Sequence, residues 1–184
     1  HPYGELTTEE TVNKITVEEC RKYYQTYFKP NISYLIIVGD ITPAAALAKA
    51  TQYFGKWQKG TVAKTAFTVP VPPKPTQVDL VNRDGSVQSV IDITYPVQLK
   101  LSQPDYLAVI VMNTLLGTDF TSRLTQNLRE DKAYTYGVGS NLSPDLEVGY
   151  FTASGSFRNS VTDSAIVEFM NEFKRMRDTK ASTE

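Results

Sequence analysis

The feature that most constrains the fold of this chain is the alternation of helical segments with short segments rich in β-branched and aromatic residues. The helical segments place apolar residues three or four positions apart, whereas the β-rich segments alternate or are apolar throughout. Predicted helices cover 16–29, 42–54, 104–117, 119–131 and 160–176, and predicted strands cover 32–39, 76–84, 87–95, 134–143 and 147–157. This order predicts an α+β fold, in which helices pack on one face of an antiparallel-rich β-sheet.

The boundaries of the predicted elements rest on residues with specific local roles. Thr16 followed by Glu19 has the spacing of a capping box, and Thr42 followed by Pro43 is a second helix start. The segment 83–86, Arg-Asp-Gly-Ser, suits a hairpin turn between the strands predicted at 76–84 and 87–95.

Apolar periodicity predicts which helices face the core. The segment 104–117 is apolar nearly all round, so we expect it to be the buried centre of the domain. Cys20 lies on the apolar face of the first helix, which predicts an ordinary core residue. The last two helices also carry apolar faces, formed by Phe120, Leu124 and Leu128 in one and by Ala165, Phe169, Phe173 and Met176 in the other.

Composition excludes several classes of function. The chain has 184 residues, of which 41% are hydrophobic and 21% charged, with a net charge of −1 and a pI near 5.9. This balance does not indicate nucleic-acid binding or attraction to a membrane surface. The longest apolar run, near 107–112, is too short to span a bilayer, so we expect no membrane insertion.

Metal and nucleophile chemistry have few candidate residues. The single histidine, His1, stands at the start of the sequence, and Cys20 is the single cysteine. Zinc sites take sets of histidine, cysteine and carboxylate ligands, so we expect no metal site and no cofactor in this chain. A histidine-based catalytic triad is not expected either, because the sequence has no internal histidine to act as the base. Gly137 and Gly139 do not complete a dinucleotide-binding motif, and they indicate a close backbone approach or a bend in a strand.

The segment 128–137, Leu-Arg-Glu-Asp-Lys-Ala-Tyr-Thr-Tyr-Gly, contains two candidate site residues, Arg129 and Tyr136. Arg129 lies near a predicted helix end and Tyr136 at the entry to a predicted strand, so both side chains can converge on one edge. Taken alone, each has an ordinary explanation, since the helix dipole favours arginine there and tyrosine is common in strands.

Three blocks of the sequence resemble, in order, the pitrilysin/insulinase-type (inverzincin) zinc metallopeptidases. The blocks are 1–4, 15–55 and 104–140, and they cover most of the chain. The third is the most specific, because a Gly-terminated buried helix leads to Ser122-Arg123-Leu124, then to Leu128-Arg129-Glu130, with Tyr136 seven residues after Arg129.

The resemblance implies a role for the chain and for the pair. Members are built of two similar halves, and only the first carries the inverted zinc motif H-x-x-E-H, which is absent here. The chain resembles the second, non-zinc C-terminal half. That half contributes Arg129 and Tyr136 to peptide binding and transition-state stabilisation, and it is expected to be inactive alone. The expected partners are a zinc-bearing N-terminal half and a peptide substrate, and bacterial members suggest the periplasm or cell envelope.

The same resemblance guides the domain boundaries. We expect 1–15 to be a lead-in from the preceding half and 16–184 to form a single α+β domain, truncated at its C-terminus. The segment 61–75, rich in proline, is expected to be an extended stretch within that domain.

Two other functions fit the same sequence. The chain could be a non-catalytic structural subunit of the same family, or a self-contained peptide-binding module. Retention of both Arg129 and Tyr136 favours the peptidase half over the structural subunit.

Overall fold

The computed structural model describes residues 2–68, 71 and 74–181, which form two compact units. The first unit comprises His1–Phe67 and the second Thr68–Glu184. The assignment of 16–184 as one domain stays a prediction. His1, which is not predicted to bind a metal, lies outside the described residues. Residues 69, 70, 72 and 73 of the proline-rich segment also lie outside them.

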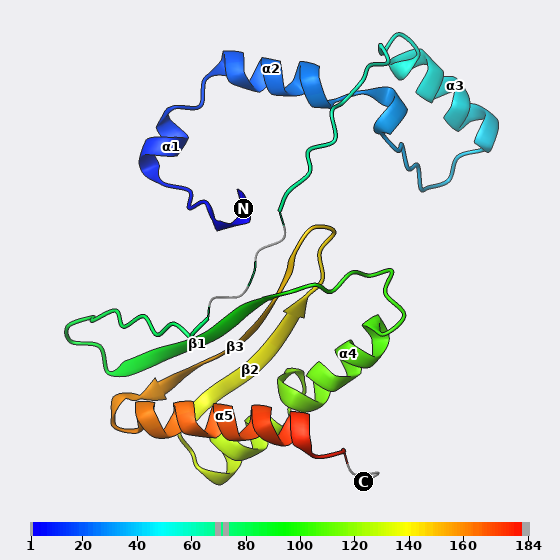
Figure 1. The fold of residues 1–184 in the computed structure, drawn as a ribbon. Helices are drawn as coiled ribbons and strands as arrows, with labels where there is room; N and C mark the ends of the chain where they lie inside the picture. The colour runs from blue at the N-terminus through cyan, green and yellow to red at the C-terminus, as the bar shows by residue number, and fades with distance from the viewer. Residues whose placement is uncertain (1, 69–70, 72–73, 182–184) are drawn as a thin grey trace. The chain divides into compact units, whose positions relative to one another are not determined.

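The first unit consists of short helices joined by extended segments (Figure 1). Its helices are η1 (Pro2–Gly4), α1 (Glu9–Asn13), α2 (Val17–Tyr27), η2 (Pro30–Ile32) and α3 (Pro43–Phe54). The Thr16 and Glu19 capping box forms as predicted, since the Thr16 amide donates to the Glu19 carboxylate at 2.7 Å and the Glu19 amide donates to the Thr16 hydroxyl at 3.2 Å. Thr42 likewise caps α3.

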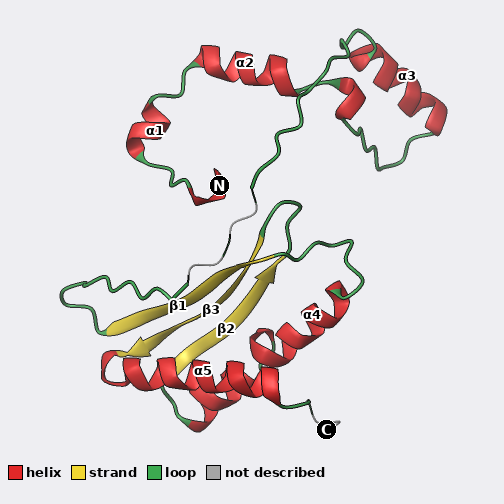
Figure 2. Ribbon diagram, viewed as in Figure 1, coloured by secondary structure: helices red, strands yellow, loops and turns green. Residues whose placement is uncertain are grey.

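The second unit is built on a three-stranded antiparallel sheet of order β1-β3-β2 (Figure 2). The strands are β1 (Gln88–Val97), β2 (Thr135–Ser143) and β3 (Gly149–Arg158). The helices of this unit lie on one face of the sheet, which confirms the predicted α+β class. They are α4 (Tyr106–Asn113), the π-helices η3 (Thr114–Thr118) and η4 (Thr125–Asp131), the 3-10 helix η5 (Asn159–Val161) and α5 (Thr162–Asp178).

The core of the second unit lies between the central strand β3 and the helices. Phe157 of β3 and Phe169 of α5 are fully buried, with ring centroids 5.7 Å apart in an edge-to-face arrangement. Leu124 and Leu128 are also fully buried, as their spacing predicts, whereas Phe120, predicted on the same face, is 76% exposed. The predicted face of the last helix is confirmed, because Ala165 and Phe169 are buried and Phe173 and Met176 pack against the core.

Two predicted strands are absent from the described residues. The segments 33–38 and 76–83 lie in neither a helix nor a strand. The turn predicted at 83–86 forms, since the Ser86 amide donates to the Arg83 carbonyl at 3.2 Å and Gly85 has φ of 73°, but it does not join two paired strands. Ile36 and Val38 are 81% and 91% exposed, and Leu80 is 90% exposed. A β-rich run forms a strand only when another strand supplies hydrogen-bond partners, which local sequence does not specify.

Two burial predictions are also wrong. The helix expected at 104–117 is shorter, changes to a π-helix at Thr114, and exposes Leu107 and Val111, so it lies at the edge of the core. Cys20 is exposed, because the apolar face of α2 packs against no core within its unit. Apolar periodicity shows that these helices carry apolar residues, but it does not show which segment, if any, packs against those residues.

Candidate functional site

Arg129 is positioned by the C-terminal part of η4. Its neighbour Leu128 is fully buried in the core, and this fixes the helix rotation so that the Arg129 side chain is partly exposed. The turn that follows is closed by the Leu128 carbonyl, which accepts from the Tyr134 amide at 2.9 Å. Ala133 adopts a left-handed conformation there, with φ of 51°, and the chain then enters β2.

Tyr136 lies beside Arg129. The Arg129 guanidinium carbon is 5.0 Å from the Tyr136 ring centroid and 5.3 Å from that of Phe120, so the cation contacts two aromatic rings. Arg129 Nε also lies 3.2 Å from the Glu130 carboxylate. Cation–π contacts of this kind contribute about 0.5–1 kcal/mol at exposed sites. The Tyr136 side chain remains mostly exposed, which leaves its hydroxyl accessible.

An irregularity in the sheet accompanies Tyr136. The β2–β3 register shifts between Thr135 and Val138, so Tyr136 and Gly137 fall outside the regular ladder. The Thr135 hydroxyl stabilises this stretch by donating to the Ser156 carbonyl at 2.6 Å, and it accepts from the Gly137 amide at 3.1 Å. Bulges of this kind redirect side chains next to functional sites.

Arg129 and Tyr136 both line one cavity of about 420 Å³. Its other lining residues are Gln88, Glu130, Ala133, Tyr134, Thr135 and Arg158. Arg158, which the sequence does not single out, also belongs to this cavity, and its Nη2 donates to the Ala133 carbonyl at 3.2 Å. An arginine at a strand end is ordinary in sequence, and tertiary contacts bring it to this cavity: Arg158 pairs with Gln88 of β1, and its amide donates to the Tyr134 carbonyl at 3.4 Å.

The two glycines that follow Tyr136 were interpreted as marking a close approach or a bend, and Gly139 confirms a close approach. A Cβ at Gly139 would lie 2.9 Å from the Gly117 carbonyl oxygen, and a Cβ at Gly117 would lie 2.5 Å from the Ser140 amide. Beside this contact the buried Ser140 hydroxyl donates to Asn113 Oδ1 at 2.8 Å. The strand that carries Tyr136 is therefore held against the α4–η3 segment.

The chemistry available in this cavity is hydrogen-bond donation and positive charge. The phenol of Tyr136 and the guanidinium groups of Arg129 and Arg158 are donors, and Glu130 is the one carboxylate in the lining. Among the described residues, no group of three histidine, cysteine or acidic side chains is placed to hold a metal ion. No helix in the described part of the chain is long and apolar enough to cross a membrane. The arrangement suits binding and stabilising a carbonyl oxygen or another acceptor.

Comparison with known families gives a match over most of the chain. Residues 14–184 match the family model described as the peptidase M16 inactive domain. Two curated bacterial relatives are uncharacterized zinc proteases. YmxG of Bacillus subtilis is 27% identical over 83% of this chain and 36% of its own length, and a Rickettsia bellii protein is 26% identical over 94% and 41%. The chain thus spans about two fifths of the length of these relatives.

Among solved structures, the fold is similar to a peptidase M16 inactive domain from Pseudomonas fluorescens. The TM-score is 0.80 with 23% identity, and the match covers 98% of this chain and 44% of the other. At this identity the likeness concerns the fold alone.

Proposed function

The chain belongs to the peptidase M16 inactive-domain family, and on this premise we propose that it is the non-zinc half of a zinc metallopeptidase. In this role it binds the peptide and completes the site but does not hydrolyse peptides alone. The zinc-bearing partner is an N-terminal half, in the same chain or in another subunit. In this proposal the partner half binds the zinc, and this chain supplies no ligand to it.

The observation that carries this proposal is the pairing of Arg129 with Tyr136 at one cavity. The guanidinium lies 5.0 Å from the phenol ring, and both groups present donors to the same space. Negative charge develops on the carbonyl oxygen of a peptide as water attacks it, and fixed donors stabilise that charge. Tyr136 donates a hydrogen bond to this oxygen, while Arg129 orients the peptide and shares the charge.

The contacts around the pair support the same role. Arg129 contacts the rings of both Phe120 and Tyr136, which limits the orientations of its guanidinium. The turn from Leu128 to Tyr134 and the Gly117–Gly139 contact fix the backbone on either side. Donors that are held in place before the reaction need little reorganisation as the charge develops.

The alternatives remain a structural subunit of the same family and a self-contained peptide-binding module. A structural subunit has no use for an accessible phenol and two guanidinium groups at one cavity. If the chain is a self-contained binding module, it should bind peptides in the absence of the zinc half, and this affinity can be measured on the chain alone. A cell-envelope location follows from the resemblance to bacterial members and stays a prediction.

The test is Tyr136→Phe in the enzyme assembled from this chain and its zinc-bearing half. The substitution removes the hydroxyl and keeps the ring, so turnover should fall by about 10²–10³ with an unchanged melting temperature. Tyr134→Phe is the matched control, because Tyr134 lines the same cavity and is not part of the pair. Equal effects of the two substitutions, or a loss of stability in place of rate, would refute the proposed role of Tyr136.

A further inference from the structure

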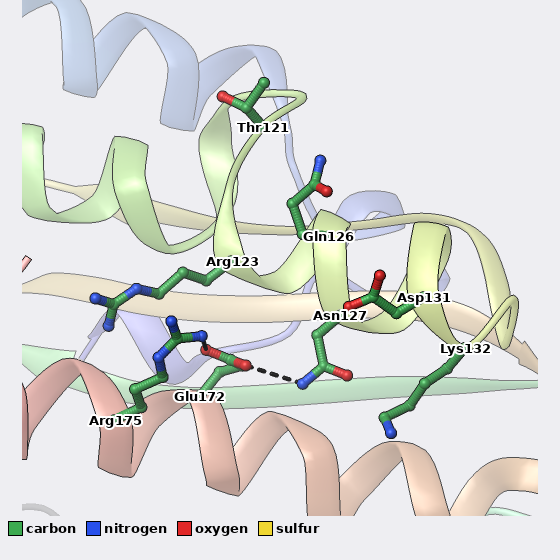
Figure 3. A pocket seen from close by; sticks show the side chains of 8 residues that line it. All are labelled: Thr121, Arg123, Gln126, Asn127, Asp131, Lys132, Glu172 and Arg175. Atoms are coloured by element: carbon green, nitrogen blue, oxygen red, sulfur yellow. Dashed lines mark hydrogen bonds and ion pairs between the residues drawn. The ribbon is translucent and has the colours of Figure 1, made fainter. Parts of the chain in front are cut away.

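The second unit has a polar cavity apart from that of Arg129 and Tyr136, and the two share no lining residue. This other cavity, of about 350 Å³, lies between the η4 region and α5 (Figure 3). There the Glu172 carboxylate accepts from Asn127 Nδ2 at 2.9 Å and lies 3.6 Å from Arg175, so groups of the chain itself engage it. The cavity of Arg129 and Tyr136 differs, because its cations are not engaged to the same degree.

The two guanidinium groups of the Arg129–Tyr136 cavity have different partners. Arg129 is engaged within the chain, since its Nε lies 3.2 Å from the Glu130 carboxylate and its guanidinium contacts two aromatic rings. The Arg158 guanidinium donates instead to a neutral group, the Ala133 carbonyl, at 3.2 Å. Among the described residues, no carboxylate lies within ion-pair distance of Arg158.

Arg158 is nevertheless tied to the turn that leads to Tyr136. The preceding residue, Phe157, is fully buried, and the alternation of a strand places its neighbour on the exposed side. The Arg158 amide donates to the Tyr134 carbonyl at 3.4 Å, and its Nη2 donates to the carbonyl of Ala133, the residue with φ of 51°. A guanidinium has five N–H donors, so the bond to Ala133 leaves others for a ligand.

The charges of the lining favour an anionic ligand group. The lining contains two cations, Arg129 and Arg158, and one carboxylate, Glu130. Because Glu130 is balanced by Arg129, the charge of Arg158 remains for a ligand. The planar fork of a guanidinium matches a carboxylate, which it can bind through two parallel hydrogen bonds. A peptide carries this group on an aspartate or glutamate side chain or at its C-terminus.

We propose that Arg158 binds a carboxylate of the peptide and makes this cavity selective for peptides that carry an acidic side chain or a free C-terminus. The inference rests on the role proposed above for the class of ligand, but it concerns affinity and not hydrolysis. A volume of about 420 Å³ falls within the usual range of ligand sites, about 300–1,000 Å³. Arg158 is therefore a specificity-determining residue, and Tyr136 and Arg129 keep their roles at the carbonyl oxygen.

The test is an NMR titration of the full chain at low salt with three pentapeptides. Acetyl-Ala-Ala-Glu-Ala-Ala-amide carries only a side-chain carboxylate, and acetyl-Ala-Ala-Gln-Ala-Ala with a free C-terminus carries only a terminal one. Acetyl-Ala-Ala-Gln-Ala-Ala-amide is the neutral reference. At least one carboxylate peptide should bind about threefold or more tightly than the reference and shift the Arg158 Nε–H signal. Which of the two does so identifies the source of the carboxylate.

Substitutions at Arg158 assign the preference. Arg158→Gln should reduce the affinity of the carboxylate peptide to that of the neutral reference and leave the reference unchanged. Arg158→Lys keeps the charge but not the fork, so it should retain only part of the preference. Arg123→Gln is the matched control, because Arg123 contacts the Met176 sulfur at 3.9 Å and lines the separate cavity of Figure 3. It removes the same charge and should leave the preference intact.

Three results would overturn the inference: equal binding of all three peptides or no binding at millimolar concentration, an undiminished preference in Arg158→Gln, or an equal loss in Arg123→Gln. If Arg158→Gln shifts the amide signals of Tyr134 and Tyr136, Arg158→Lys decides instead. A reduced preference in that variant supports the inference, and an unchanged preference overturns it. The titration needs neither the zinc half nor turnover, so its failure is distinct from failure of the Tyr136→Phe test.

Discussion

The unit from His1 to Phe67 contains well-capped helices but no buried side chain among its described residues, whereas the unit from Thr68 to Glu184 packs Phe157 and Phe169 into a core. Both units carry apolar runs of similar strength. The difference is that the runs of the second unit meet one another across a sheet and a helix layer. Capped helices therefore require only neighbouring residues, while strands and buried faces require a partner.

The largest effect on stability is expected from a substitution in the core of the second unit. Phe169→Ala should lower the free energy of unfolding by about 3–5 kcal/mol, because it removes a fully buried ring and leaves a cavity. Tyr24→Ala in α2, where the ring is about half exposed, should change it by under about 0.5 kcal/mol. Chemical denaturation of both variants measures this difference. Equal losses would mean that the face of α2 is buried in solution.

A leucine pair makes the same comparison within the second unit. Leu128→Ala should cost about 2–5 kcal/mol, since Leu128 is fully buried, and the loss should also disturb the turn that carries Arg129. Leu107 is 72% exposed, so Leu107→Ala should be nearly neutral. A large loss from Leu107→Ala, measured by its denaturant midpoint, would restore the original expectation that 104–117 is the buried centre.

A smaller effect is expected from a helix cap in the first unit. Thr16→Ala removes the hydroxyl that accepts from the Glu19 amide at 3.2 Å. Loss of such a cap costs about 0.5–2 kcal/mol of helix stability, which should appear as reduced helical circular dichroism and faster amide exchange at the start of α2. Thr16→Ser retains the acceptor and should behave as the parent. An equal loss in both variants would assign the effect to something other than the cap.

The smallest predicted effect is a pH dependence in the second unit. The hydrogen bond from Asn127 lowers the pKa of Glu168 below its ordinary value, despite partial burial, and Lys132 acts in the same direction. A lowered folded-state pKa contributes stability above the unfolded pKa, and this contribution is lost as pH falls through the folded value. Glu168→Gln should therefore cost under about 1 kcal/mol at neutral pH and nothing in acid.

The parent chain, unfolded over the same pH range, is the control for that titration. If Glu168→Gln kept the parent slope between neutral and acidic pH, the Asn127 hydrogen bond would not stabilise the charged form of Glu168 in solution.

The sequence predicted those parts of the fold that depend on adjacent residues. The caps at Thr16 and Thr42, the strands around 88–97, 135–143 and 149–158, and the buried face of α5 all follow from local chemistry and periodicity. The segments 33–38 and 76–83 could not be decided in this way, because their apolar residues do not determine whether a partner strand lies beside them. The π-helical turns of η3 and η4 have no distinct sequence pattern and depend on packing.

In the candidate site, too, the sequence predicts residues that are close along the chain and misses those that are distant. Arg129 and Tyr136 were found because both lie in one short segment. Arg158 was missed, because it reaches the cavity through contacts with residues distant in sequence, namely Gln88 of β1 and the turn at Ala133 and Tyr134. Distant residues meet only through tertiary structure, which periodicity does not report.

The turn between η4 and β2 has a consequence for how the Arg129–Tyr136 pair can change over evolution. The segment from Leu128 to Tyr134 closes on itself through its own backbone hydrogen bond, with Ala133 at the left-handed position. Both members of the pair thus lie in one contiguous segment, residues 128–136, which can be inherited or grafted as a unit. Substitutions among the other residues that line the cavity can change which ligand is bound. Insertion of one residue within the segment 128–136 would separate the two side chains.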